Sequence, residues 1–497
     1  MNSKVLINLL ATGVPGLDEL LGGGFSEFSF NLIAGSPGCG KTTLAHQVMF
    51  ALATPERPAL FFTAMGEPPL KMLRYQQQFD FFNSEAVNRY IHFINIRDEN
   101  LTESLEDLMG RIANELEKHN PSLVFVDSFR SIAFPNSVAS NSINNLQEFV
   151  QRLCFLMTTY QATTFVLDEN LQDTEYNSAF TIADGLIWLR QSMLRNSMVR
   201  KIEVIKMRGQ ASMPGLHSFR IDRTGIKVFP PILIPRPTRA DSATTPPYKR
   251  LLTGVPSLDE MLAGGLPRGY SLLVAGPSGS GKSILASAFL AEGARCGETG
   301  VIAAFEQHPN KSLNHVIADL INNDQVGLVD SQAPDLSINE IVLLIITEIR
   351  RLKATRVVID SLSGFELLIA PTFRSDFRES MARMLAALAN EGVTALMTSE
   401  LEDRYTDLRF SPYGTAFLTD AIIVMRYIEV DSQLLRVMAV VKVRACAHSN
   451  ELREFSIGNE GIQIGEMLKD QEGLLGGRPT RKHVADLPTE SVGADND

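Results

Sequence analysis

Short apolar runs alternate along this chain with longer amphipathic segments. Short runs of mostly apolar residues cover positions 30–34, 59–63 and 123–127. Positions 101–118 and 338–353 instead repeat apolar residues every three or four places, as helices with one buried face do. Continuous apolar runs are typical of parallel strands that are covered on both faces. The pattern therefore predicts an α/β fold in which strands and helices alternate.

The second half of the chain repeats the order of the first. The segment Thr-Gly-Val-Pro-x-Leu-Asp-Glu occurs at 12–19 and again 241 residues later, at 253–260. A single long offset indicates a domain-sized duplication. We therefore expect two tandem modules, each a mainly parallel twisted sheet flanked by helices. Their strands are expected at 30–34, 59–63, 123–127, 163–167 and 182–189, and at 271–275, 301–305, 356–360, 393–398 and 419–425.

A proline-rich stretch separates the two modules. Four of the eight residues from 230 to 237 are proline, which cannot continue a helix or a central strand. We expect a first module over 1–229, a semi-rigid linker over 230–249 and a second module over 250–465. The last residues, 466–497, contain few large apolar side chains and are expected to form a flexible tail.

Each module carries a glycine-rich phosphate-loop motif between an apolar strand and a helix. Gly35 to Thr42 reads GSPGCGKT and Gly276 to Ser283 reads GPSGSGKS, and both fit G-x-x-x-x-G-K-[ST]. Glycines let backbone N–H groups surround a phosphate chain at a helix N-terminus. The expected nucleotide-binding residues are Gly35, Ser36, Pro37, Gly38, Cys39, Gly40, Lys41, Thr42 and Thr43, and Gly276, Pro277, Ser278, Gly279, Ser280, Gly281, Lys282, Ser283 and Ile284.

The motif also predicts a magnesium site in each module. The lysines, Lys41 and Lys282, are expected to reach the β and γ phosphates, while the hydroxyls of Thr42 and Ser283 bind the ion. An apolar strand ends in Asp-Ser in each half, at Asp127 and at Asp360. Parallel sheets bind ligands at the carboxyl ends of their strands, so these aspartates are expected to hold the water shell of the ion.

Composition narrows the class of protein further. The chain has 497 residues, of which 44% are apolar and 21% charged, as in soluble globular proteins. No apolar run approaches the roughly 20 residues of a membrane span and no export signal is evident, so we expect a cytoplasmic protein that does not bind membranes. The four cysteines show no Cys-x-x-Cys spacing, so neither zinc nor disulfides are implied. The net charge of −11 argues against a broad nucleic-acid surface, because binding to phosphates depends on clustered Lys and Arg.

With these landmarks, residues 8–465 resemble the KaiC family of double RecA-like ATPases. The first half has Lys206-Met207-Arg208-Gly209 on a late strand, and the second has Lys442-Val443-Arg444-Ala445 at the corresponding place. The resemblance implies two tandem RecA-like P-loop NTPase domains that use ATP and Mg²⁺. It also implies that Lys206, Arg208, Lys442 and Arg444 reach the nucleotide of a neighbouring chain, in a homo-oligomeric and typically hexameric ring. Regulatory proteins are expected at the first-domain surface or at the tail, where 476–481 resembles the family's segment between ring and tail.

The resemblance further implies a general base in each module. The family has paired glutamates after the strand that follows the phosphate-loop helix. Here the first half reads Ala-Met-Gly-Glu-Pro with Glu67, and the second reads Ala-Phe-Glu-Gln-His with Glu306. Each module keeps one glutamate, but Glu67 lies one place from the usual position and Glu306 lies on it. We therefore expect unequal modules.

A second departure from the family concerns autophosphorylation. Ala416 and Phe417 occupy the positions of the family's Ser-Thr acceptor pair. Neither can accept a phosphoryl group, which leaves Ser411, Thr415 and Thr419 as nearby alternatives. The main hypothesis is a magnesium-dependent ATPase that acts as a signalling or timing switch. The alternatives are a Ser/Thr autokinase and, less favoured by the acidic balance, a RecA- or RadA-like DNA-handling ATPase.

Overall fold

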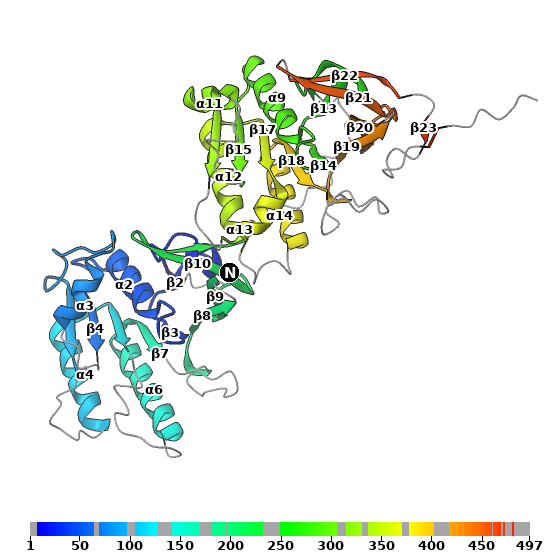
Figure 1. Ribbon diagram of the computed structural model, residues 1–497. Helices are drawn as coiled ribbons and strands as arrows, with labels where there is room; N and C mark the ends of the chain where they lie inside the picture. Colours follow the sequence, from blue (N-terminus) through cyan, green and yellow to red (C-terminus); the bar gives the residue numbers. More distant parts are fainter. Residues whose placement is uncertain are drawn as a thin grey trace, which may run out of the picture. The chain divides into compact units, whose positions relative to one another are not determined.

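The computed structural model divides the chain into two compact units, Met1–Pro231 and Ile232–Asp497 (Figure 1). The structure describes residues 7–63, 69–96, 105–127, 142–168, 181–194, 197–231, 249–305, 315–330, 336–369, 377–401, 417–430, 432–459, 461–468, 471–472 and 480–481.

The described part of the first unit forms one nine-stranded sheet with the order β11-β10-β9-β8-β3-β7-β6-β4-β5. The strands from β8 to β5 pair in parallel, and β8 to β11 pair antiparallel. Its strands are β3 (Phe30–Gly35), β4 (Ala59–Thr63), β5 (Ile91–Asn95), β6 (Leu123–Asp127), β7 (Thr163–Asp168), β8 (Gly185–Leu194), β9 (Ser197–Met207), β10 (Leu216–Asp222) and β11 (Gly225–Phe229). Its helices are α1 (Leu17–Leu21), α2 (Lys41–Leu52), α3 (Pro69–Gln76), α4 (Leu105–His119) and α6 (Ser142–Thr159), and β1 (Leu9–Leu10) pairs with β2 (Phe25–Ser26).

The second unit repeats this topology among its described residues, in the order β16-β15-β17-β18-β14-β19-β20-β21-β22. Its strands are β14 (Ser271–Gly276), β15 (Gly300–Ala304), β16 (Val326–Asp330), β17 (Arg356–Asp360), β18 (Thr394–Glu400), β19 (Ala421–Val430), β20 (Gln433–Val443), β21 (Arg453–Gly458) and β22 (Gly461–Met467). Its helices are α8 (Pro256–Met261), α9 (Lys282–Arg295), α11 (His315–Asn322), α12 (Ile338–Leu352), α13 (Leu362–Leu368) and α14 (Phe377–Asn390). Two short pairs, β12 (Arg250–Leu251) with β13 (Leu266–Pro267) and β23 (Gln471–Glu472) with β24 (Thr480–Arg481), lie outside the main sheet.

The continuous apolar strands are explained by burial on both faces of the sheet. In the first unit, Ile33 packs in a core with residues of α2, whereas its neighbour Leu32 packs in a second core with residues of α4 and α6. Successive residues of a strand point to opposite faces, so a strand between two helical layers must be apolar throughout. The predicted fold class, two mainly parallel helix-covered sheets in tandem, is confirmed.

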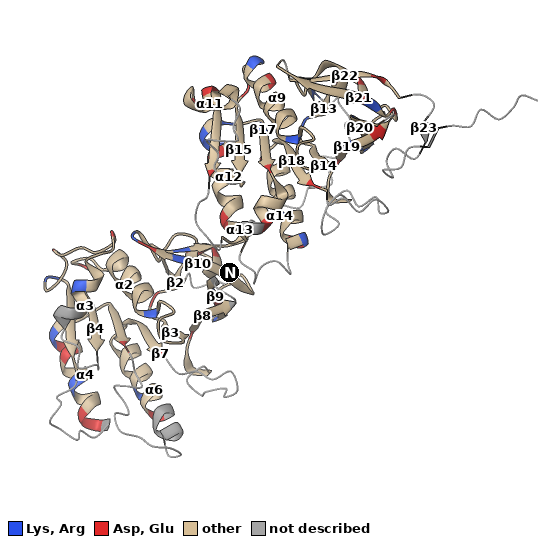
Figure 2. Ribbon diagram, viewed as in Figure 1, with Lys and Arg blue, Asp and Glu red and all other residues tan. Residues whose placement is uncertain are grey.

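Charges at the helix ends follow the helix dipole. The first turn of α4 contains Glu106 and Asp107 and its last turn contains Lys118 and His119, and Figure 2 shows charges of both signs along this helix. In α12, the Ser337 side chain accepts a hydrogen bond from the N–H of Glu340, and Arg350 and Arg351 lie in the last turn. Acidic first turns and basic last turns offset the partial charges of the unpaired backbone groups.

Most element boundaries agree with the sequence pattern, and two strands are longer than expected. The strands expected at 182–189 and 419–425 are β8 and β19, which run to Leu194 and Val430 because each pairs over its length with the next strand. The helix expected at 101–118 is α4 from Leu105 onward; 101–104 lie outside the described residues. The strand β22 continues to Met467, just past the residue at which the tail was expected to begin. No helix in the described ranges is long and apolar enough to span a membrane.

A buried arginine distinguishes the second unit from the first. Arg356, the first residue of β17, is 1% exposed, and its Nε donates to Glu298 Oε2 at 2.8 Å. Its Nη1 donates to the carbonyls of Leu252 at 2.7 Å and Phe289 at 2.8 Å. The equivalent strand of the first unit, β6, begins with the apolar Leu123. Arg356 therefore links β17 to α9 and to the segment after β12 through a charged guanidinium group that is almost fully buried.

We expect Glu298→Ala to lower the free energy of unfolding of the second unit by about 3 kcal/mol, because removing one partner leaves a buried charge uncompensated. Urea unfolding followed by far-UV circular dichroism measures the loss. The fluorescence of Trp188, the chain's only tryptophan, follows the first unit and should be unchanged.

Glu391→Ala is the matched control, since it breaks the Arg350–Glu391 pair, whose arginine side chain is 69% exposed. Exposed pairs contribute at most about 1 kcal/mol. Equal losses in the two variants would show that burial of Arg356 does not set the cost.

Candidate nucleotide-binding sites

The first phosphate loop joins the end of β3 to the start of α2. Gly40, which precedes the helix, has φ 111°, a backbone conformation that glycine adopts without strain. A Cβ atom there would lie 2.7 Å from Ile221 Cδ1 on β10. Gly281 of the second loop repeats this arrangement, with φ 102° and Ile457 Cδ1 at 2.7 Å from a Cβ. At both positions, the positive φ and the nearby isoleucine side chain therefore favour glycine over any residue with a Cβ atom.

The loop lysines bond to the carbonyls of their own loops. Lys41 Nζ donates to the carbonyls of Gly35 at 2.8 Å and Ser36 at 3.0 Å, and the residue is 4% exposed. Lys282 Nζ donates to the carbonyls of Gly276 and Pro277, both at 2.8 Å. Carbonyls satisfy hydrogen bonds but do not neutralise a buried ammonium charge. A phosphate in the first loop would supply the opposite charge for the buried ammonium group of Lys41.

The candidate metal ligands of the first unit are in direct contact. Thr42 Oγ1 donates to Asp127 Oδ2 at 2.8 Å, which joins the first turn of α2 to the last residue of β6. Hydroxyl and carboxylate oxygens are the hard ligands that Mg²⁺ takes, usually alongside several waters and phosphate oxygens. The residues present therefore fit a magnesium ion.

A pocket of about 270 Å³ brings the expected residues of the second unit together. The residues that line it are Ser278, Gly279, Gly281, Lys282, Ser283, Ile284, Asp360, Ser361 and Glu400. The carboxylate of Asp360 accepts a hydrogen bond from the hydroxyl of Thr398 on the neighbouring strand β18. Thr398 and Glu400 were not predicted as site residues from the sequence. The signal available was their position at the carboxyl end of an apolar strand, the edge that also carries Asp360.

The two candidate bases, Glu67 and Glu306, lie outside the described residues. The strands that precede them are β4 and β15, and each pairs in parallel with an aspartate-bearing strand. Thr63 pairs with Asp127, and Ala304 pairs with Asp360. The chain segments with the two glutamates therefore start from the same sheet edge as the candidate metal ligands.

The lysine and arginine that are expected to act on a neighbouring chain are called the arm residues. In the first unit they are Lys206 and Arg208, and they form a compact set of hydrogen bonds. Lys206 Nζ donates to the Thr181 carbonyl at 3.1 Å. Arg208 Nη2 donates to the same carbonyl at 2.9 Å, and Nη1 donates to Asp184 Oδ1 at 3.1 Å. Burial first, and the nearby Arg208 charge second, lower the pKa of Lys206.

The arm residues of the second unit, Lys442 and Arg444, show the same pattern. Lys442 Nζ donates to the Thr419 carbonyl at 2.7 Å. Arg444 Nη1 donates to Asp420 Oδ1 at 3.1 Å, and Nη2 donates to the Phe417 carbonyl at 3.2 Å. The pKa of Lys442 is lowered by burial and then by Arg444. Both arginine side chains are 55% exposed.

The arm residues lie at the opposite end of the central strand from their own phosphate loop. Arg208 N donates to the carbonyl of Asp184, and Gly185 pairs with Asn31 near the beginning of β3. The loop follows the end of the same strand, five residues further on, or roughly 16 Å at the usual rise per residue. The second unit has the same register, with Arg444 N on the carbonyl of Asp420 and Asp420 N on that of Ser271. The structure therefore does not bring the arm residues to the nucleotide site of their own unit.

Two helix-covered parallel sheets, each with a phosphate loop, define a tandem P-loop ATPase of the RecA-like fold. The family model for the KaiC ATPase matches residues 10–232 and 251–469. The chain belongs to the KaiC ATPase family. It is 27% identical over 494 residues to the circadian clock oscillator protein KaiC of Rippkaea orientalis, covering 97% of this chain and 93% of that protein. It is 27% identical to the protein of the same name from a Picosynechococcus species and 26% identical to KaiC 1 of a Synechocystis species, each over 96% of this chain and 93% of the relative.

We expect Lys41→Ala and Lys282→Ala each to remove nucleotide from one unit only, because each ammonium group serves a separate loop. Equilibrium titration with ATP should give two nucleotides per wild-type chain and one per variant. Lys118→Ala on α4, whose side chain is 65% exposed, is the control and should still bind two. One nucleotide per wild-type chain would rule out two working sites.

Proposed function

We propose that this chain is a magnesium-dependent ATPase that works as a hexameric ring and acts as a timing or signalling switch. The observation that carries the proposal is the position of the arm residues. Lys206 and Arg208, like Lys442 and Arg444, lie at the far end of the strand that leads to the phosphate loop of their own unit. Because the arginine side chains at that end are about half exposed, they are available to contact the nucleotide of another copy of the chain. A ring closes such head-to-tail contacts so that every site is completed.

Within each site, different residues would bind the phosphates, hold the metal and stabilise charge in the transition state. Lys41 and Lys282 bind the phosphates, and Thr42 and Ser283 hold the metal, with Asp127 and Asp360 on its water shell. A magnesium ion held there would neutralise charge that develops on the phosphates. An arginine from the neighbouring chain would stabilise the same charge, an effect worth ~10³–10⁵ in rate in the best cases. Such arginines lower the barrier more than they raise nucleotide affinity, since the charge grows in the transition state.

The timing role is supported by the relatives, which are named circadian clock oscillator proteins. A switch of this kind needs regulators, and we propose that they bind the surface of the first domain or the tail after residue 465.

The residues near the family's acceptor positions favour hydrolysis over phosphorylation of the protein. Phe417 has no hydroxyl, and its ring lies under the guanidinium of Arg378 on α14, 4.3 Å from ring centroid to Cζ. Thr419 is 1% exposed, and its carbonyl accepts the hydrogen bond from Lys442. Ala416, Ser411 and Thr415 lie outside the described residues. The described alternative acceptor is therefore buried, which argues against a Ser/Thr autokinase.

The ring is tested by native mass spectrometry with and without Mg-ATP. We expect six chains per particle with Mg-ATP and smaller species after the nucleotide is removed, because bound nucleotide contributes to the contact between copies. A chain that stays monomeric while it holds two nucleotides would refute the ring.

The two units should contribute unequally to hydrolysis. A base must come within about 2.6–3.2 Å of the proton it takes, directly or through one water, so a displacement of one residue turns the side chain away. Glu306→Gln should therefore remove most of the ATP turnover, and Glu67→Gln should remove less. Phosphate release measured for both variants checks the order, and equal losses would contradict it.

A further inference from the structure

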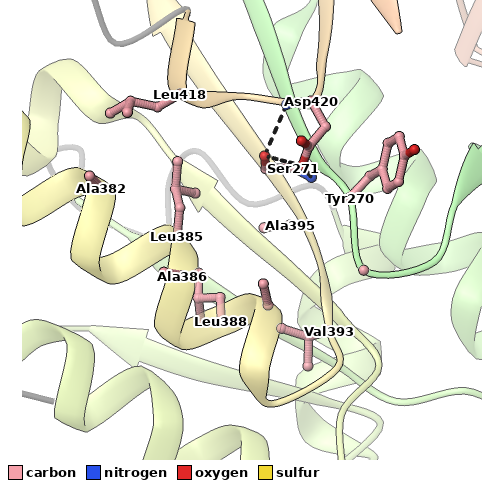
Figure 3. A pocket seen from close by; sticks show the side chains of 12 residues that line it. Tyr270, Ser271, Ala382, Leu385, Ala386, Leu388, Val393, Ala395, Leu418 and Asp420 are labelled. Atoms are coloured by element: carbon pink, nitrogen blue, oxygen red, sulfur yellow. Dashed lines mark hydrogen bonds between the residues drawn. The ribbon is translucent and has the colours of Figure 1, made fainter. Parts of the chain in front are cut away.

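One aspartate joins the arm arginine to the phosphate-loop strand in the second unit. Asp420 Oδ1 accepts from Arg444 Nη1 at 3.1 Å. The other oxygen, Oδ2, accepts from the backbone N–H of Ser271 at 3.0 Å and from its hydroxyl at 2.9 Å. Ser271 is the first residue of β14, the strand that ends at the loop. Figure 3 shows Asp420 and Ser271 bonded together beside a small, largely apolar pocket of about 210 Å³ that α14 helps to line.

The first unit repeats the same bridge with different neighbours. Asp184 Oδ1 accepts from Arg208 Nη1 at 3.1 Å, and Oδ2 accepts from the backbone N–H of Phe30, the first residue of β3, at 3.0 Å. Phe30 has no hydroxyl, so the features common to both units are the carboxylate, the arginine and one backbone N–H. The bridge thus persists although the residue at the start of the strand has changed.

A carboxylate bonded in this way fixes the direction of the arginine. The carboxylate group is planar and rigid, so the hydrogen bonds that hold Oδ2 on the strand also orient Oδ1 toward the guanidinium. The second hydrogen bond of each arginine, to the carbonyl of Thr181 or Phe417, fixes the plane of the guanidinium. The strand itself is rigid, because every residue of β3 and of β14 is buried. An arginine side chain has many rotamers, and the hydrogen bonds to the aspartate and to the carbonyl restrict it to few of them. More than half of the side chain nevertheless stays exposed.

We propose that Asp184 and Asp420 are positioning residues that hold Arg208 and Arg444 in the orientation needed at a neighbouring nucleotide. They touch no substrate themselves and act only through the arginine. The inference rests on the role in trans proposed above for the arginines.

The test compares ATP turnover of the full-length variants Asp420→Asn, Arg444→Ala and the double variant. Asparagine keeps one oxygen for the strand N–H but presents an uncharged amide to the guanidinium. Asp420→Asn should lower kcat about tenfold and leave KM within about twofold, because the lost interaction acts in the transition state. The double variant should match Arg444→Ala within about twofold, since the aspartate has no effect once the arginine is gone.

Ser271→Ala is the matched control and should leave kcat unchanged, because Phe30 shows that the bridge does not need the hydroxyl. Asp184→Asn with Arg208→Ala repeats the test in the first unit, and it decides the question if Asp420→Asn does not fold by circular dichroism.

The outcomes separate this inference from the proposal on which it rests. If Arg444→Ala and Arg208→Ala leave ATP turnover unchanged, the arginines have no role in trans. The inference about the aspartates is then wrong as well. If the arginine variants lower turnover but the aspartate variants do not, the role in trans stands and positioning by aspartate is wrong. Additive losses in the double variants would also overturn it, because they would mean that the aspartate acts on the fold and not through the arginine.

Discussion

The central parallel strand of each unit, β3 or β14, is the constraint on which the rest of the site depends. Helical layers cover it on both faces, so its residues are buried and mostly apolar, and it cannot move without disturbing the cores on either side. Its carboxyl end leads into the phosphate loop, where Gly40 or Gly281 precedes a helix whose N-terminal N–H groups could bind an anion. Its amino end carries the aspartate bridge to the arm arginine. One buried strand thus holds two functional groups at a separation set by its length.

That separation explains why one chain would make two incomplete sites. In the proposed function, the loop would bind the phosphates and the metal, and the arm residues would add positive charge, but the two groups lie at opposite ends of the same sheet. A second copy that presents its arm to the loop of the first would complete the charge balance around a nucleotide. The duplication repeats this geometry in both units, although the second unit has the buried Arg356 where the first has Leu123.

Much of the fold and part of the site could be predicted from the sequence. Apolar runs, the doubled phosphate loop and the Asp-Ser strands are local patterns, and they correctly indicated two parallel sheets. The contact between Thr42 and Asp127 brings together two residues that the motifs had each indicated separately. Glu400 and the bridges of Asp184 and Asp420 were missed because they depend on which strands are neighbours, and strand order is not written in any one segment. Arg356 was missed because a single arginine at the start of an apolar strand gives no sign that it is buried. The assignment of Glu67 and Glu306 as bases remains a prediction.

The central claim, that each nucleotide site is built from two chains, is tested most directly by mixing two inactive variants. One carries Lys41→Ala and Lys282→Ala, and the other carries Arg208→Ala and Arg444→Ala. In mixed rings, an intact loop of the second variant meets an intact arm of the first, so up to about a quarter of the wild-type turnover should return if neighbours combine at random. No recovery of ATP hydrolysis, in particles shown by mass to contain both variants, would contradict the account.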